Sequence, residues 1–299
     1  MKSFIRLRAF AKINLGLSVR QKRSDGYHEI FTVYQTIALH DRLTIQLSKV
    51  ERGVSVQCDD TRIPSGPQNL VHRACTLWKR ARNYYGGIKV YLEKRIPAGS
   101  GLGGGSSDAA AALLGLERLT GDQLDWASRL KLAARLGSDV PLFLWGGRVL
   151  GCARGEEVYP LWDFPRRPCL VIFPEFPIST AGAYRELDQR PNLRLTKEFK
   201  HSKICSFGAW PHLSLEFWGP AENDFEQVVF ARWPELARLK SQLIRAGAET
   251  ASLTGSGSAV FALFDSAPKM IRASKSIPEQ WHVFRTRTLP RDEYERLVF

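Results

Sequence analysis

The chain has 299 residues, of which 44% are hydrophobic, and this composition supports a packed core and excludes a disordered chain. Residues 109–116 form the longest run free of polar side chains, too short to span a membrane, and arginines interrupt the N-terminal segment where an export signal would lie, so we expect a cytoplasmic protein. The net charge of +13 is compatible with an anionic ligand, but Lys and Arg are spread along the whole chain, so we expect neither nucleic acid nor a membrane as the main partner.

The first segment of the chain alternates between apolar and polar residues with a period of two. This pattern predicts a half-buried strand with Lys12 and Asn14 on its exposed side. Residues 23–26 have the composition of a turn, and a second alternating segment follows at 31–39. Together these segments predict a β-hairpin over residues 5–39. Further strands are expected at 43–47, 54–57 and 88–92.

A glycine-rich segment, residues 97–109, lies between a predicted strand and a helix expected over 107–119. Successive glycines let the backbone approach a ligand closely and turn several N–H groups toward one point. Ser106 and Ser107 stand at the helix start, where free N–H groups and the helix dipole favour a phosphate. We interpret Asp108 as a complement to that dipole. The segment therefore predicts a phosphate-binding loop.

Other glycine-rich motifs fit this loop less well. Gly99, Gly101 and Gly104 satisfy the dinucleotide pattern GxGxxG, but the strand before them is charged and alternating instead of continuously apolar. No Gly-Lys-Ser/Thr closes the loop as in a Walker A motif, and the chain has no HRD or DFG triplet of a protein kinase. A flexible linker with Ser107 as helix cap is the alternative, and it is disfavoured because the loop runs directly from a strand into an alanine-rich helix.

The rest of the chain mixes strands and helices without regular βαβ alternation, which predicts two α+β domains. A helix is expected over 122–136, ended by Gly137. A linker is expected near 160–168, followed by a central strand at 169–173. The remaining elements expected are helices at 222–232 and 234–246, strands at 250–254 and 258–264, and a last helix and strand.

Several polar residues outside the loop are candidates for the same site, although each also has a plain structural explanation. Lys12 fits an exposed strand residue, and Asp139 fits the cap of a short helix that follows it. Tyr27 and His28 follow a turn, where an exposed aromatic pair could stack on a base or a sugar. A second glycine turn, residues 254–258, lies between two apolar strands and is either a simple hairpin or a ligand contact.

Three ordered segments resemble the motifs of the GHMP family of small-molecule kinases. They are residues 11–15 (AKINL), 97–109 (PAGSGLGGGSSDA) and 253–261 (LTGSGSAVF). Three further segments resemble the members of this family whose acceptor is a cytidine-diphosphate alcohol. They are residues 23–28 (RSDGYH), 137–141 (GSDVP) and 222–226 (ENDFE). These matches are ordered and span nearly the whole chain.

The resemblance implies an α+β fold with an N-terminal domain like ribosomal protein S5 domain 2 over residues 1–163 and a ferredoxin-like C-terminal domain over 164–299. It implies a kinase that transfers the γ-phosphoryl group of ATP, with Mg²⁺, to a hydroxyl of a cytidine-diphosphate alcohol. The magnesium ligands are not assigned, and the five scattered cysteines have no CxxC spacing. A mevalonate-like or amino-acid alcohol acceptor, or an RNA-binding role, is the alternative. The oligomeric state is not predicted.

The resemblance also implies roles for single residues. Asp139 is the expected general base, and Lys12 keeps it ionised and stabilises developing charge. The same ammonium weakens Asp139 as a base, so two roles stay open for Asp139: accepting the proton, or mainly positioning the hydroxyl. The residues expected to bind ATP are Pro97, Ala98, Gly99, Ser100, Gly101, Leu102, Gly103, Gly104, Gly105, Ser106, Ser107, Asn69 and Lys94. The residues expected to bind the acceptor are Asn14, Tyr27, His28 and Thr180, with Tyr27 and His28 around the cytosine.

Overall fold

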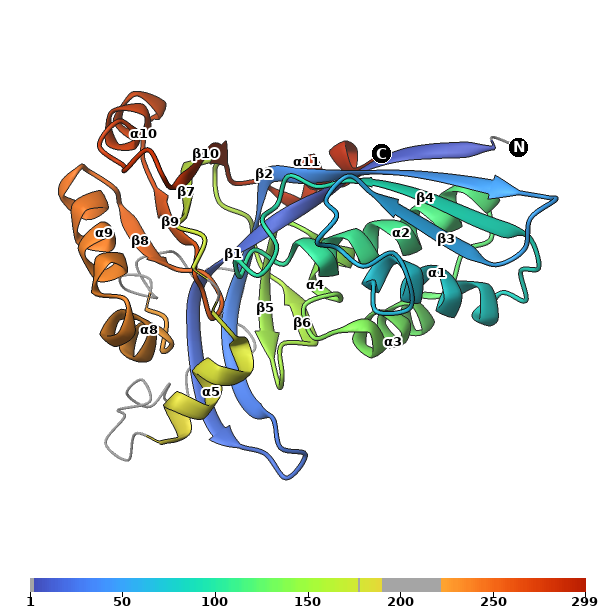
Figure 1. The fold of residues 1–299 in the computed structure, drawn as a ribbon, viewed down its shortest axis with the longest axis horizontal. Helices are drawn as coiled ribbons and strands as arrows, with labels where there is room; N and C mark the ends of the chain where they lie inside the picture. The colour runs from blue at the N-terminus through green and yellow to red at the C-terminus, as the bar shows by residue number, and fades with distance from the viewer. Residues whose placement is uncertain (1–2, 177, 190–221) are drawn as a thin grey trace.

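Two β-sheets with helices packed on them make up the computed structural model, which describes residues 3–176, 178–189 and 222–299 (Figure 1). The first sheet contains β1 (Phe4–Lys22), β2 (His28–Ser48), β3 (Val54–Cys58), β4 (Gly87–Glu93), β5 (Arg148–Cys152) and β6 (Glu157–Pro160). The second contains β7 (Pro168–Phe173), β8 (Thr250–Leu253), β9 (Val260–Leu263) and β10 (His282–Arg287). This mixture of strands and helices confirms the predicted α+β class.

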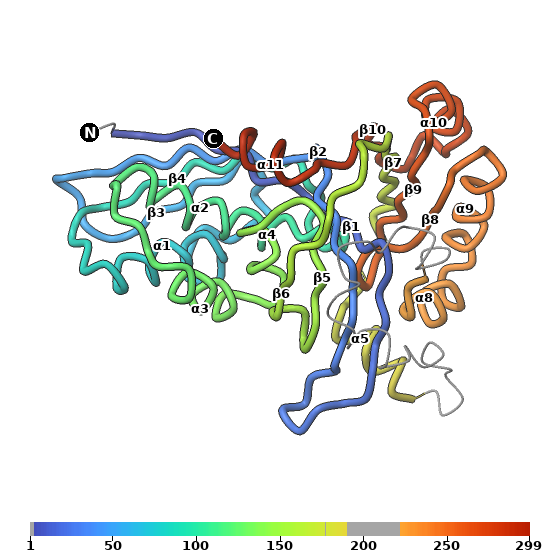
Figure 2. The backbone as a smooth tube through the Cα atoms, turned by 180° about the vertical axis from the view of Figure 1, so that it is seen from behind, coloured from blue at the N-terminus to red at the C-terminus, as the bar shows by residue number. Residues whose placement is uncertain are grey.

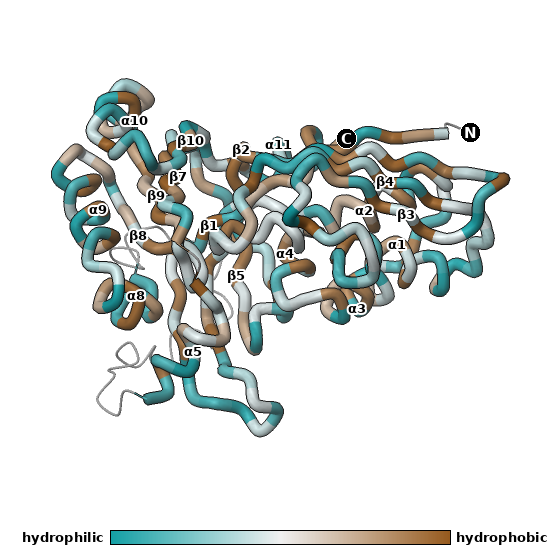
Figure 3. The backbone as a smooth tube through the Cα atoms, in the orientation of Figure 1, coloured by the Kyte–Doolittle hydropathy of each residue, from teal (hydrophilic) through white to brown (hydrophobic). Residues whose placement is uncertain are grey.

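The helices divide between the two sheets in the same way (Figure 1). The first sheet carries α1 (Leu70–Ala81), α2 (Gly104–Thr120), α3 (Trp126–Leu136), α4 (Leu142–Trp145) and α11 (Arg291–Val298). The second carries α5 (Thr180–Asp188), α8 (Glu226–Arg232), α9 (Pro234–Arg245) and α10 (Ala267–Ser274). Apolar residues of these helices and of the strands form the buried cores, and hydrophobic segments occur in both kinds of element in Figure 3.

The β1–β2 hairpin joins two units, each of which consists of one sheet and the helices packed on it. Its strands pair antiparallel along their length, which confirms the predicted hairpin, and the strand expected at 43–47 is the continuation of β2. The hairpin projects past the other strands beside α5 (Figure 2), and its end is hydrophilic (Figure 3). Leu17, Val19 and Ile30 belong to the apolar core of the second unit. Packing on both units therefore holds this hairpin between them.

The order of strands places β2 and β7 inside their sheets. The first sheet runs β3-β4-β2-β5-β6, with β1 also paired to β2, and the second runs β10-β7-β9-β8. The position of β7 confirms the central strand predicted at 169–173. Residues 161–167 connect β6 to β7, and the domain boundary between residues 163 and 164 stays a prediction.

Three helix starts differ from the sequence prediction, and one of them is α8, which begins at Glu226 instead of residue 222. Helix α2 begins at Gly104, so Asp108 lies in its second turn, and its carboxylate contacts Lys94 instead of complementing the dipole at the helix end. The interpretation of Asp108 as a dipole complement is therefore wrong. Helix α3 begins at Trp126 because the Asp125 side chain accepts from the Ser128 N–H and caps it.

The last helix and strand expected correspond to α10 and β10, whereas the C-terminal helix that follows them, α11, was not predicted. It returns from the second sheet to the first, beside the N-terminal strand (Figure 2). The Tyr294 hydroxyl donates to the Phe143 carbonyl at 2.6 Å, and its ring lies 5.5 Å from that of Phe10.

Within the described ranges, the four cysteines are free, while Cys205 lies outside them. No helix there is long and apolar enough to cross a membrane.

Candidate active site

A cleft of about 950 Å³ opens between the β1–β2 hairpin, the glycine loop and helix α5. It brings together nearly all of the predicted site residues. Those that line it are Lys12, Asn14, Tyr27, His28, Asn69, Lys94, residues 97–106, Asp139 and Thr180. Ser107 is the exception, because its side chain is buried outside the cleft and its hydroxyl has no partner among the described residues. The individual roles stay predictions.

Lys12 and Asp139 form an ion pair in the cleft. The Lys12 Nζ lies 3.6 Å from Asp139 Oδ2, and the side chains are 3% and 34% exposed. Burial lowers the pKa of Lys12, while the Asp139 carboxylate opposes that shift. The Tyr34 hydroxyl donates to Asp139 Oδ1 at 3.1 Å. Two side chains, Lys12 and Tyr34, therefore orient Asp139. Helix α4, which follows Asp139, has no hydrogen bond from a capping side chain, so the interpretation of Asp139 as a helix cap is wrong.

The burial of Lys12 differs from the exposed position expected on an alternating strand. The β1–β2 register shifts between Phe10 and Lys12 and again between Asn14 and Gly16. Such irregularities re-aim side chains, and they recur beside active sites. The glycine loop also covers this part of β1, since the Lys12 N–H donates to the Leu102 carbonyl at 3.0 Å. Lys12 and Asn14 are consequently each only 2% exposed.

Asn14 connects Lys12 to the second glycine turn. Its Oδ1 accepts from Lys12 Nζ at 2.7 Å, from the Thr254 hydroxyl at 3.2 Å and from the Gly255 N–H at 2.8 Å. Its Nδ2 donates to the Thr32 hydroxyl at 2.7 Å. The amide is thus used within the protein, where it holds Lys12 in place. Gly255 and Ser256 line the cleft, so the turn at 254–258 is more than a simple hairpin.

The glycine loop is locked against that turn. Gly101 has a φ of +84°, and a Cβ there would collide with the Thr254 carbonyl oxygen. The Ala259 N–H donates to the Ser100 carbonyl at 3.1 Å. The loop leads into α2, where residues 104–106 line the cleft. Their N–H groups precede that of Ser107, the first to donate to a carbonyl of the helix turn, at Gly103. These groups and the helix dipole suit a phosphate.

An aromatic wall lies at the hairpin end of the cleft. His28 stacks on Tyr184 with ring centroids 4.9 Å apart and an interplanar angle of 13°. The His28 Nε2 lies 2.7 Å from Asp188 Oδ1, which fixes the ring. Tyr27 is 56% exposed, with the Arg154 guanidinium 5.0 Å from its ring centroid. This wall offers flat faces and polar edges to a planar group.

Thr180 and Asn69 both line the cleft and are held by neighbours. The Thr180 hydroxyl lies 2.8 Å from that of Ser256, which ties α5 to the second glycine turn. Asn69 caps α1, since its Oδ1 accepts from the Val71 N–H at 2.8 Å. Its Nδ2 donates to the Pro64 carbonyl at 2.7 Å. Lys94, the other predicted adenosine contact, directs its ammonium to Asp41 and Asp108.

Sequence reasoning missed Tyr34, Tyr184 and Asp188, which also line this cleft. Tyr34 lies at a position of the second alternating segment where the pattern predicts an exposed side chain. In the structure the residue is only 1% exposed. Tyr184 and Asp188 belong to α5, which was not predicted. A helix signal existed there, because Ser179 precedes apolar residues at helical spacing and its side chain caps α5.

Comparison with known proteins identifies the family. The family model for the GHMP kinases N terminal domain matches residues 69–147, and the model for the GHMP kinases C terminal matches residues 207–283. The chain is 43% identical over 293 residues to the 4-diphosphocytidyl-2-C-methyl-D-erythritol kinase of Solibacter usitatus (strain Ellin6076), covering 97% of this chain and 90% of that relative.

Solved structures agree with these matches. A crystal structure of 4-(cytidine 5'-diphospho)-2C-methyl-D-erythritol kinase is similar with a TM-score of 0.78 and 35% identity, covering 95% of this chain and 99% of that one. Homoserine kinase from Cytophaga hutchinsonii has a TM-score of 0.73 at 20% identity, covering 98% and 97%, and shares the fold. The chain therefore belongs to the GHMP kinase family, and it is an ATP-dependent small-molecule kinase.

Proposed function

We propose that this kinase transfers the γ-phosphoryl group of ATP to the 2-hydroxyl of 4-diphosphocytidyl-2-C-methyl-D-erythritol, a step of non-mevalonate isoprenoid precursor synthesis. One observation carries the proposal: a single cleft combines a phosphate-binding loop, the Lys12–Asp139 pair and an aromatic wall. The names of the relatives that are similar along almost the whole chain support the same acceptor. Since the donor is ATP, we propose a cytoplasmic location.

In this proposal the glycine loop holds the donor. The left-handed Gly101 and Gly103 let the loop backbone pack closely against Thr254 and beside Lys12 where it turns into α2, because a side chain at either position would meet these residues. The N–H groups of residues 104–106 bind the phosphate oxygens, and the Ser106 hydroxyl adds a further donor. The adenosine lies toward Asn69 and Lys94.

We propose that Mg²⁺ accompanies ATP. The described residues contain no group of three or more His, Cys, Asp and Glu side chains that could hold a metal. This fits a magnesium ion that takes most of its oxygen ligands from phosphates and water. The Ser106 hydroxyl, at the start of α2, and the Asp139 carboxylate are the protein oxygens of the cleft suited to complete its coordination. When bound, the ion neutralises charge on the transferred phosphoryl group.

The Lys12–Asp139 pair lies where the acceptor hydroxyl reacts. Asp139 orients the hydroxyl and accepts its proton as the new O–P bond forms and the bond to the ADP leaving group breaks. Lys12 stabilises the negative charge that develops on the phosphoryl oxygens. Phosphoryl transfer depends mainly on positioning and charge neutralisation. The contacts of Lys12 with Asn14 and of Asp139 with Tyr34 supply that positioning.

The aromatic wall selects the acceptor. In our proposal Tyr27, His28 and Tyr184 surround the cytosine, because stacked rings with polar edges suit a nucleobase better than a small aliphatic acid. Mevalonate or homoserine would leave this wall uncovered. The similarity to homoserine kinase extends to the fold and leaves the acceptor undecided, so the wall is the discriminating feature.

The direct test is an ADP-release assay with the cytidyl acceptor beside mevalonate and homoserine, at several magnesium concentrations. Phosphorus NMR of the product then locates the new phosphate. We expect turnover with the cytidyl acceptor alone and a phosphomonoester on its 2-hydroxyl. Absence of turnover with this acceptor at every magnesium concentration would refute the proposal.

A further inference from the structure

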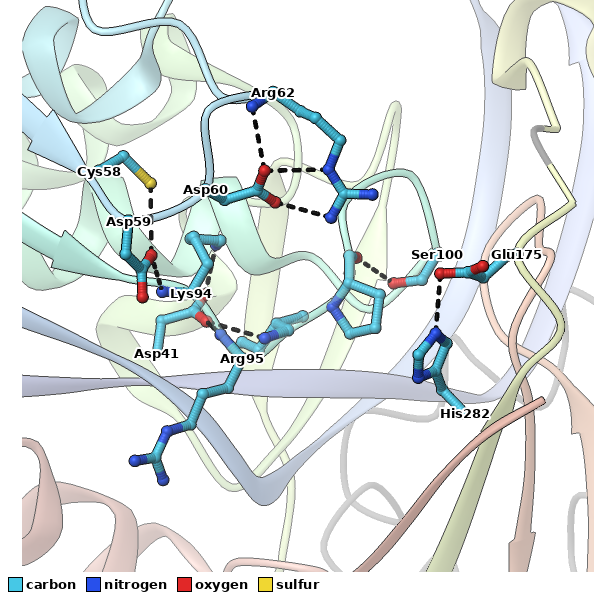
Figure 4. Close-up of polar contacts among 12 residues, drawn as sticks. Asp41, Cys58, Asp59, Asp60, Arg62, Lys94, Arg95, Ser100, Glu175 and His282 are labelled. Carbon is cyan, nitrogen blue, oxygen red and sulfur yellow. Dashed lines mark hydrogen bonds and ion pairs between the residues drawn. The ribbon is translucent and has the colours of Figure 1, made fainter. Parts of the chain in front are cut away.

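Two carboxylates fix the segment that leads from β4 into the glycine loop. The Lys94 N–H donates to Asp59 Oδ1 at 2.8 Å. The Arg95 N–H donates to Asp41 Oδ1 at 2.5 Å (Figure 4). The Ile96 N–H donates to the same oxygen at 2.8 Å. These three residues follow the last residue of β4, so side-chain carboxylates replace the partners that a strand ladder would give them.

The Lys94 side chain connects this segment to the helix beyond the loop. Its ammonium donates to Asp41 on β2 and, at 2.7 Å, to Asp108 Oδ2 in the second turn of α2. The three side chains are 8%, 0% and 3% exposed, in the order Lys94, Asp41, Asp108. We call Asp41, Lys94 and Asp108 the loop staple, because they join the two ends of residues 97–103 across the base of the loop.

The loop staple lies directly beside the expected phosphate position. A Cβ on Gly104, the first residue of α2, would come within 3.2 Å of Lys94 Nζ and 2.9 Å of Ile96 Cγ2. The ammonium therefore packs against the start of the helix whose N–H groups line the cleft. Because both carboxylates engage it, two of the three donors of this ammonium are used to hold the loop.

We propose that the loop staple is a set of positioning residues for the donor site, which holds the two ends of the phosphate-binding loop in register and thereby sets the affinity for ATP. The proposal rests on the proposed function only in taking the loop as the ATP site. It assigns no contact with the acceptor, so it does not depend on which alcohol is phosphorylated.

The test measures the dissociation constant of a non-hydrolysable ATP analogue with Mg²⁺ by calorimetry, without any acceptor. Lys94→Met and Asp108→Ala are each expected to raise this constant at least ~10-fold, which corresponds to about 1.4 kcal/mol. The double variant is expected to bind no more weakly than the weaker single variant, because both break the same staple. Unchanged binding, or effects that multiply, would overturn the proposal.

A matched control separates loop positioning from general loss of stability. Glu117 lies toward the far end of α2 and forms a comparably buried ion pair with Arg129 at 2.6 Å. Glu117→Gln is expected to lower the melting temperature while leaving the dissociation constant of the analogue unchanged. If Glu117→Gln weakens binding as much as Lys94→Met does, the staple has no specific role.

Asp108→Asn provides a second variant that keeps the shape of the side chain and can still accept from Lys94. Its dissociation constant for the analogue is expected to be closer to the wild-type value than that of Asp108→Ala. If Asp108→Asn binds the analogue as weakly as Asp108→Ala does, the bond to Lys94 does not hold the loop, and the role of Asp108 is overturned. If the staple variants weaken binding of the analogue as expected but the enzyme does not turn over the cytidyl acceptor, the proposed function is refuted and the role of the loop staple stands.

Discussion

Replacing Lys12 by Met separates the catalytic role of its charge from any structural role. Met keeps an unbranched chain of similar length and fills the same space without the ammonium. The substitution removes a cation whose side chain is 3% exposed and which lies 3.6 Å from Asp139 Oδ2. Asp139 keeps its bond from the Tyr34 hydroxyl, so the carboxylate stays in place.

The expected loss of activity follows from the geometry of the pair. At an effective dielectric constant of about 20, two unit charges separated by the 3.6 Å between Lys12 Nζ and Asp139 Oδ2 interact by about 4–5 kcal/mol. If the ammonium lies at a similar distance from the negative charge that develops on the phosphoryl group, it stabilises the transition state by about 4 kcal/mol. This corresponds to a factor of about 10³ in rate. We therefore expect Lys12→Met to lower kcat by about 10³ or more.

The expected effect on stability has the opposite sign. Asp139 is 34% exposed, so water solvates it when Lys12 is gone, and the variant should be as stable as the wild type or more stable by about 1–4 kcal/mol. Burial lowers the pKa of Lys12, so the folded protein binds this proton less tightly than the unfolded chain. The gain should therefore be greatest at neutral pH and shrink as pH approaches 10.5, the unperturbed value. Asp139→Asn leaves a buried ammonium unpaired and should be destabilised, by up to about 3–5 kcal/mol.

Single-turnover rates and thermal unfolding at pH 7 and near pH 10 test this reasoning. A kcat within about tenfold of the wild type would remove Lys12 from the transition state. A clear fall in melting temperature at pH 7 would show that the buried ammonium stabilises the fold, against the argument from burial.

Three other substitutions test neighbouring parts of the site. Tyr34→Phe removes one hydrogen bond to a charged carboxylate, so kcat should fall about 10–100-fold with the KM for acceptor little changed; a changed KM alone would contradict this. Tyr184→Ala removes a stacking surface worth about 1–3 kcal/mol, so the KM for the cytidyl acceptor should rise about 5–150-fold while ATP binding is unaffected; equal losses for both ligands would argue against a base-stacking role. Gly101→Ala should abolish tight ATP binding, because its Cβ meets the Thr254 carbonyl. Gly121 has a similar φ with nothing near its Cβ, so Gly121→Ala should only lower stability. Similar ATP binding by both variants would refute the role given to the close approach of Gly101 to Thr254.

Local patterns predicted much of the fold. The alternation over residues 5–39 identified the hairpin, and the apolar run at 169–173 identified a central strand. Helix α11 was missed because its burial depends on contacts with Phe143 and Phe10, which are distant in the chain. Periodicity alone does not show that a terminal segment returns to the first sheet.

The site was predicted from motifs more completely than from periodicity. The motif residues line one cleft, but the alternation put Lys12 on an exposed face, since it carries no information about the register shifts or the covering loop. Their partners Tyr34 and Tyr184 come from segments with no motif of their own. Asp108 was misread because a first-turn acid and a buried ion-pair partner have the same local sequence.

The central claim is that one cleft phosphorylates an alcohol that carries a cytidine diphosphate. The most direct measurement compares kcat/KM for 4-diphosphocytidyl-2-C-methyl-D-erythritol with that for the same alcohol carrying a single phosphate and no cytidine. Binding energy from the cytidine should lower the reaction barrier at the distant hydroxyl, so we expect the cytidyl acceptor to be favoured by about 100-fold or more. Equal kcat/KM values for the two acceptors would contradict the account.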